Sequence, residues 1–156
     1  MSLATVRISS PTGIAGKSNM TTILWLSRHE PLPAQVSALR RKFGEVKIVK
    51  YQRPLSTAAD AIHLAKECGA EYIIPVLPLS FIAYLVDQAS KEGIKIIMAK
   101  MKSIHECYQQ PCPQFMEDYD TIIESRDYNS GIKIYRHYRF EKFCILEGIK
   151  FIERDL

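Results

Sequence analysis

The sequence predicts an α/β protein: a three-layer, Rossmann-like or flavodoxin-like parallel sheet of about four strands, extended by antiparallel C-terminal strands. First, four short apolar runs have the length and character of strands buried on both faces. Second, amphipathic helical patterns alternate with these runs through short connections, which predicts right-handed crossovers. Third, the later part of the chain changes to strand patterns separated by turn residues. The order of the parallel strands stays open between 2-1-3-4 and 3-2-1-4.

The elements of the parallel part follow in order. The strands are expected at residues 22–26, 46–51, 72–77 and 94–98. The helices are expected between Pro33 and Gly44, between Ser56 or Thr57 and Gly69, and between Pro78 and Gly93. Proline suits a first helical turn because its missing N–H costs nothing there. Glycine suits the position that follows a helix, because it adopts the left-handed conformation readily.

The remaining residues divide into a leader, an excursion and a tail. Residues 1–19 are rich in Ser, Gly and Pro, contain no acidic residue and are expected to be a flexible leader to a single domain at 20–156. Residues 102–118 lack a period and are expected to be irregular, and 119–156 to be a β-rich tail. Within the tail, residues 120–126 and 132–140 flank a turn signal and predict a hairpin. Residues 143–152 predict a second hairpin or a bent strand.

Composition excludes several classes of protein. The chain has 156 residues, 47% hydrophobic and 24% charged, which is ordinary for a globular protein and argues against disorder or a coiled coil. Four cysteines are too few for a disulfide framework at this length. No apolar run reaches the roughly 18 residues of a membrane span, so we expect a cytoplasmic protein. The net charge of +4 permits an anionic partner.

Ligands of open parallel sheets bind outside the carboxyl ends of the strands, and basic residues collect there in this sequence. The predicted ligand-binding residues are Ser27, Arg28, Arg53, Leu79, Ser80, Lys100 and Lys102. With the positive end of the third helix, these residues predict a rim that attracts an anionic, nucleotide-like or phosphorylated ligand. No G-x-G-x-x-G or Walker loop is present, so no cofactor is assigned.

An enzyme is the first alternative. His29 would be a nucleophile or general base with Glu30 nearby, and Arg28 would stabilise phosphate charge. The segment at residues 26–30, Leu-Ser-Arg-His-Glu, resembles the signature of the histidine phosphatases, in which Arg-His-Gly-Glu implies a phosphorylated histidine. This sequence lacks the glycine after His29 and a second histidine after a later strand, so that membership is rejected.

Two further patterns suggest other chemistry. The spacing of His105, Cys107 and Cys112 suggests three ligands of a zinc site. The fourth ligand would come from His137, Cys144 or Glu106. Their spacing differs from that of standard zinc knuckles, which favours incidental residues, and no metal is assigned.

Residues 135–140 interleave basic and aromatic side chains, as in proteins that bind single-stranded nucleic acid. A charged edge strand is the favoured interpretation, and an interaction protein acting through this tail is the second alternative.

Two resemblances accompany these patterns. The combination of Leu-Ser-Arg-His-Glu-Pro at residues 26–31, Val-Leu-Pro-Leu-Ser at residues 76–80 and a strand-rich tail resembles a group of small Rossmann-like prokaryotic and phage-type proteins of unknown function. Ser27, Arg28 and Lys100 are also similar in position to residues of the CRISPR-associated Rossmann-fold sensors, a likeness that implies a homodimer binding a cyclic oligonucleotide.

Overall fold

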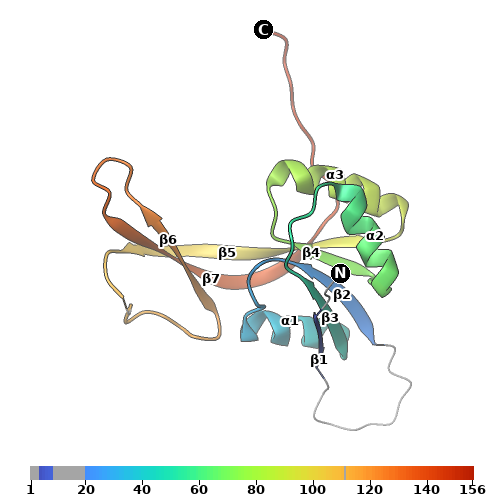
Figure 1. Cartoon of the computed structure of the whole chain (residues 1–156), viewed down its shortest axis with the longest axis horizontal. Coiled ribbons are helices and arrows are strands. Elements are labelled where there is room, and N and C mark those ends of the chain that lie inside the picture. Colours follow the sequence, from blue (N-terminus) through green and yellow to red (C-terminus); the bar gives the residue numbers. More distant parts are fainter. Residues whose placement is uncertain (1–3, 9–19, 111) are drawn as a thin grey trace.

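The structure, a computed structural model, describes residues 4–8, 20–110 and 112–156. It is a mixed α/β fold in which one seven-stranded sheet has the order β1-β3-β2-β4-β5-β7-β6 (Figure 1). The four strands of the parallel core are β2 (Thr21–Leu26), β3 (Val46–Tyr51), β4 (Tyr72–Pro75) and β5 (Lys95–Cys107). The sheet therefore exceeds the expected number of strands, because antiparallel strands extend both edges. Counted along the core, the parallel order is 2-1-3-4, one of the two orders that the sequence left open.

Three helices cover the two faces of this core. One face packs α1 (Pro33–Phe43) through Leu39 against Trp25 and Ile48. The other face packs α2 (Ala58–Cys68) and α3 (Leu79–Lys91). Because both faces are covered, β2 and β4 are apolar along most of their length, as buried parallel strands usually are, whereas β3 carries Lys47 and Lys50.

The helix boundaries lie where the sequence predicted them. Pro33 is the first residue of α1, and the Gln35 side chain accepts the Leu32 N–H at 2.8 Å. Thr57, rather than Ser56, caps α2: its Oγ1 accepts the Asp60 N–H, and Asp60 accepts the Thr57 N–H in return. Gly69 ends α2 at φ +70°, in the left-handed region that glycine favours.

Strand β5 differs most from expectation. It was predicted to end at residue 98 but continues to Cys107, because β7 (Lys133–Leu146) pairs with it antiparallel along its length. Residues 102–107 of the predicted irregular excursion are therefore a strand. The predicted hairpin at the start of the tail is confirmed: β6 (Asp120–Arg126) pairs antiparallel with β7. Residues 147–156 form no strand, so the second predicted hairpin is wrong.

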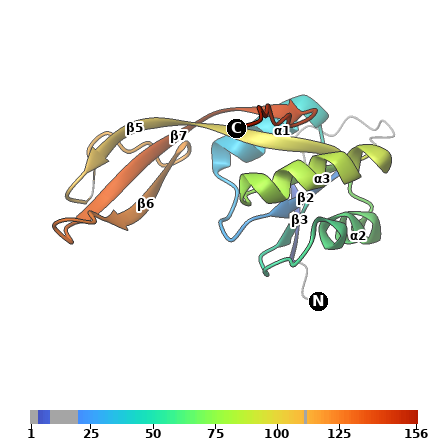
Figure 2. The same cartoon turned by 90° about the horizontal axis from the view of Figure 1, so that it is seen from above.

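Beyond the pair Lys100↔Lys142, β5 and β7 continue past the parallel core, and β7 pairs there with β6. We call this part, residues 101–141, the arm. The loop before β6 still contacts α1, where the Ala34 N–H donates to the Asp118 carbonyl at 3.0 Å. Figures 1 and 2 show it projecting from the core on one side, with β6 at its outer edge.

At the opposite edge of the sheet, β1 (Ala4–Ile8) pairs antiparallel with β3. This strand lies within the segment that was expected to be a leader. The rest of that segment, residues 1–3 and 9–19, lies outside the described part of the chain.

Candidate functional site

A cavity of about 280 Å³ lies at the carboxyl ends of β2, β3 and β4. It is lined by Leu26, Ser27, Arg28, His29, Tyr51, Gln52, Arg53, Pro54, Leu55, Val76 and Leu77. Four of the residues that the sequence selected, Ser27, Arg28, His29 and Arg53, thus come together in one place. We call this the edge cavity. The parallel order places it where successive connections leave the sheet in opposite directions, which is where such folds usually bind ligands.

The loop after β2 is held by hydrogen bonds to its own backbone. Ser27 is buried, and its Oγ accepts the His29 N–H at 3.1 Å. The indole Nε1 of Trp25 donates to the His29 carbonyl at 2.8 Å. These two bonds hold the backbone N–H and carbonyl of His29, directly after Arg28, whose side chain is exposed at the cavity.

The charge at the edge cavity is positive. Arg28 and Arg53 line it, and neither guanidinium has an ion-pair partner among the described residues. Among those residues, none that lines this cavity is acidic. Glu30 lies just outside it, where it pairs with Lys50 and accepts a hydrogen bond from Gln52 Nε2 at 3.3 Å. That carboxylate is therefore occupied by a lysine and an amide.

The other predicted residues lie elsewhere. Leu79 and Ser80 form the first turn of α3 and do not line the edge cavity. Lys100 and Lys102 were expected to follow the end of a strand, and that expectation is wrong because β5 continues past them. They lie opposite Lys142 and Arg139 of β7, exposed on the strand.

A second cavity, of about 400 Å³, adjoins the first and lies between the core and the arm. We call it the arm cavity. The two share Ser27, His29, Val76 and Leu77. The arm cavity is mainly apolar, with Trp25 and Met98 from the core and Thr121, Ile123 and Tyr138 from the arm. Sequence reasoning missed it, because its far wall depends on how β6 and β7 pair with β5.

A cluster of histidine and cysteine side chains lies on the arm. His105 Nε2 is 2.6 Å from Cys107 Sγ and 3.1 Å from Cys112 Sγ. Cys112 Sγ is 3.9 Å from His137 Nδ1. Desolvation, and then the interaction with Cys112, raise the pKa of the Cys107 thiol. Three of these residues are the zinc ligands that the sequence suggested. The pairing of β5 with β7 brings His137, one of the candidates for the fourth ligand, next to them.

Behind this cluster, the buried side chains of Asp120 and His137 meet at 2.5 Å between Oδ2 and Nε2. Arg139 donates to both carboxylate oxygens of Asp120, from Nε at 2.7 Å and from Nη2 at 3.0 Å. The hydrogen bond from Arg139 is the main cause that holds the pKa of Asp120 well below its usual range. The basic and aromatic segment lies in β7, which pairs with β5 on one side and β6 on the other, so the interpretation as an edge strand is wrong. One face of this strand is engaged within the protein, with His137 buried and Arg139 bonded to Asp120.

Comparison with protein-family models, with curated proteins and with solved structures finds no match for this chain. None of the described helices has the length and apolar character needed to cross a membrane.

Proposed function

We propose that this protein binds an anionic, nucleotide-like ligand whose phosphate lies in the edge cavity. The observation that carries the proposal is that Arg28 and Arg53, which follow different strands, line the same cavity at the carboxyl ends of a parallel sheet. Guanidinium groups bind phosphate oxygens through two parallel hydrogen bonds, which gives both charge and geometry.

The adjoining arm cavity supplies the second half of the argument. A nucleotide has an anionic end and a flat apolar end, and the two cavities offer one environment for each. The base would lie among Trp25, Met98 and Tyr138, while the phosphate would lie against the arginines. The flavodoxin-like order of the parallel strands supports the same position for a ligand.

Phosphoryl transfer or phosphate-ester hydrolysis through His29 is a second candidate, because His29 lines both cavities. Its predicted helper, Glu30, is paired with Lys50 and bonded to Gln52, so the carboxylate is held by partners other than His29. For this reason binding is preferred to catalysis here.

The test is a titration of the full chain with ATP, ADP, a cyclic dinucleotide, inorganic pyrophosphate and uncharged adenosine. A ligand present at about 100 times its Kd stabilises a protein by about 2.7 kcal/mol. For a chain of this size, that corresponds to a rise in Tm of roughly 5–11 °C. We expect a phosphate-bearing member of the panel to give such a rise, and adenosine to give a smaller one.

Arg28→Ala and Arg53→Ala should each weaken that binding about 10- to 100-fold, since a hydrogen bond to a charged group contributes about 1.5–3 kcal/mol. Arg126→Ala removes the same charge from an exposed position on β6 and is the matched control. The proposal fails if no member of the panel binds, or if the two cavity variants bind as wild type does. Turnover of a phosphate ester that is lost in His29→Asn would favour the enzyme instead.

A further inference from the structure

We propose that the arm holds one zinc ion, bound by His105 Nε2, Cys107 Sγ, Cys112 Sγ and His137 Nδ1. The site shares no residue with the edge cavity. The four donors come from three segments: β5 gives His105 and Cys107, the loop after β5 gives Cys112, and β7 gives His137.

The distances among three of the donors, from His105, Cys112 and His137, fit one tetrahedral ion. Zinc lies about 2.0–2.1 Å from nitrogen and about 2.3 Å from sulfur, so ligand atoms on a tetrahedron are about 3.3–3.8 Å apart. Cys112 Sγ lies 3.1 Å from His105 and 3.9 Å from His137, and all three donor atoms lie within 4.8 Å of one another. Cys107 lies outside that group of three, but its Sγ is 2.6 Å from His105 Nε2. We assign it as the fourth ligand, which requires its thiolate to move away from His105 by about 1 Å when the ion binds.

The choice of metal follows from the donors. Two thiolates and two imidazoles are a set that structural zinc sites use, whereas magnesium and calcium prefer oxygen. All four positions of the tetrahedron are filled by the chain. The site is therefore closed and structural, with no open position for a substrate.

An irregularity in the pairing of β5 with β7 places these side chains on one face of the sheet. In the pairing of β5 with β7, Ser103 lies opposite Tyr138 and His105 opposite His137, which leaves Ile104 as an extra residue. Tyr138 and His137 are neighbours and so point to opposite faces of the sheet. The bulge at Ile104 therefore turns His105 onto the face of His137, and Cys107, two residues later, follows onto that face.

The carboxylate bonded to the outer nitrogen of His137 matches the usual surroundings of a metal-bound histidine. Asp120 binds His137 at Nε2, which leaves Nδ1 directed toward Cys112. A carboxylate on the outer nitrogen is the usual way in which proteins orient a histidine that binds metal. Arg139 in turn fixes the carboxylate with two hydrogen bonds.

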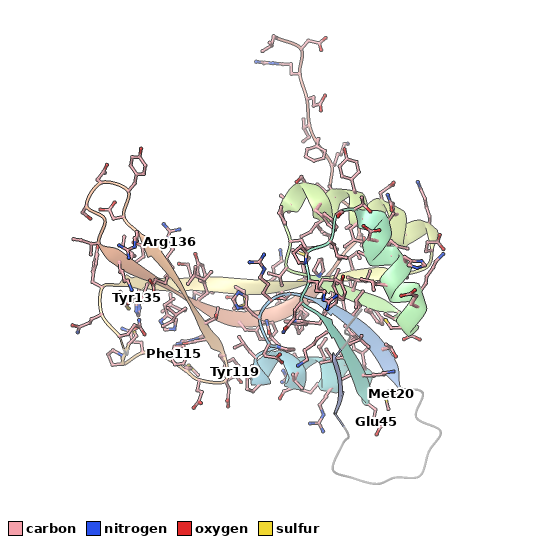
Figure 3. All side chains as sticks on the ribbon, in the orientation of Figure 1. Met20, Glu45, Phe115, Tyr119, Tyr135 and Arg136 are labelled. Carbon is pink, nitrogen blue, oxygen red and sulfur yellow. The ribbon has the colours of Figure 1, made fainter. Side chains whose placement is uncertain are left out.

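The loop after β5 covers the cluster. The ring of Phe115 packs against that of His137, with centroids 5.8 Å apart. Figure 3 labels Phe115 and Tyr119 on this loop and Tyr135 and Arg136 on β7. Cys112 and His137 are both buried, at 7% and 0% exposure.

A bound ion would also stabilise the arm. Of the described residues between 102 and 139, none belongs to either of the two hydrophobic clusters of the core. A few strands without a shared core are only marginally stable, and a metal that bridges them supplies the missing stability. The ion would join β5, the covering loop and β7.

The test is metal analysis of the full chain purified under reducing conditions, with X-ray absorption at the zinc edge. We expect one zinc per chain, with two sulfur and two nitrogen neighbours. Replacement by Co²⁺ should give the visible bands of a tetrahedral ion and a thiolate charge-transfer band. Cys107→Ser and Cys112→Ser should weaken the visible Co²⁺ bands and the thiolate charge-transfer band. Cys68→Ser and Cys144→Ser should leave these bands unchanged, because they alter cysteines outside the cluster.

A purified protein without zinc that takes up neither Zn²⁺ nor Co²⁺ overturns the proposal. A zinc shell without sulfur also overturns it, as does cobalt absorption that is unchanged in Cys107→Ser and Cys112→Ser. The absorption measurement on the unaltered chain keeps the test decisive even if a cysteine variant folds poorly. Loss of nucleotide binding in Arg28→Ala would leave all these readouts unchanged, so the two proposals fail separately.

Discussion

His105 and His137 lie directly opposite each other in the pairing of β5 with β7, with ring centroids 4.9 Å apart and planes at 86°. This edge-to-face contact joins two residues that are distant in the sequence. The Nε2 atoms of the two rings have different partners: that of His137 bonds to Asp120, whereas that of His105 contacts the two cysteines. The first two predictions follow from that asymmetry.

Asp120→Asn should weaken zinc binding about 10- to 100-fold, because the carboxylate orients His137 and increases its basicity. Competition with a chromophoric chelator measures the change. Glu117→Gln alters an exposed acidic residue of the covering loop and should leave zinc affinity as it is. Equal affinity in Asp120→Asn and wild type would argue against His137 as a ligand.

Removal of metal should expose two thiols. Cys107 and Cys112 should resist alkylation in the purified protein and react after treatment with a strong chelator, because metal-bound thiolates are unavailable to the reagent. Cys68 should react slowly in both states, since burial raises the pKa of its thiol. Peptide mass mapping identifies the modified cysteines, and identical labelling with and without chelator would contradict the prediction.

Thr57→Ala should lower the free energy of unfolding by about 1 kcal/mol, because Thr57 caps α2 through the Asp60 N–H. Urea denaturation measures the loss. Ser56→Ala is the matched control, since the neighbouring hydroxyl does not form the cap, and it should have little effect. Equal losses in the two variants would show that the cap contributes nothing specific.

The turn between β6 and β7 should weaken in acid. The Asp127 carboxylate accepts hydrogen bonds from the Ser130 hydroxyl at 2.8 Å and from the Asn129 N–H at 3.2 Å. Of these, the Ser130 bond contributes most to lowering the pKa of Asp127. Because the folded pKa is below the unfolded value of about 3.9, the stabilisation is present above that value and is lost as the pH falls through the folded pKa.

NMR titration of the Asp127 carboxyl carbon checks this directly. We expect a midpoint below about 3.9 in the wild type and a shift back toward that value in Ser130→Ala. A wild-type midpoint at or above the unfolded value would refute the assignment.

The parallel core could be predicted from the sequence because its signals are local. Apolar runs mark the buried strands, and residues such as Pro33, Thr57 and Gly69 mark the helix boundaries. The edge cavity was partly predictable for the same reason. Arg28 and Arg53 follow strands whose ends can be read locally, and the rule for parallel sheets brings those ends together.

The arm was harder to predict because its pairing is long-range and interrupted. Extra residues at Ile104 in β5 and Glu141 in β7 break the two-residue alternation that identifies a strand. The strand that holds Lys100 and Lys102 therefore looked as if it had ended. The selection of His137 depends on the register between β5 and β7, which no local pattern specifies.

Strand β5 runs without interruption from the core to the end of the arm. Its Met98, Ala99 and Met101 line the arm cavity, and its His105 and Cys107 belong to the metal cluster. This strand therefore contributes to both proposed sites, so the proposed ion and the proposed nucleotide would be thermodynamically linked wherever one of them displaces the strand. Such linkage is reciprocal: the factor by which zinc changes nucleotide affinity equals the factor by which nucleotide changes zinc affinity. Measuring either factor thus gives the other.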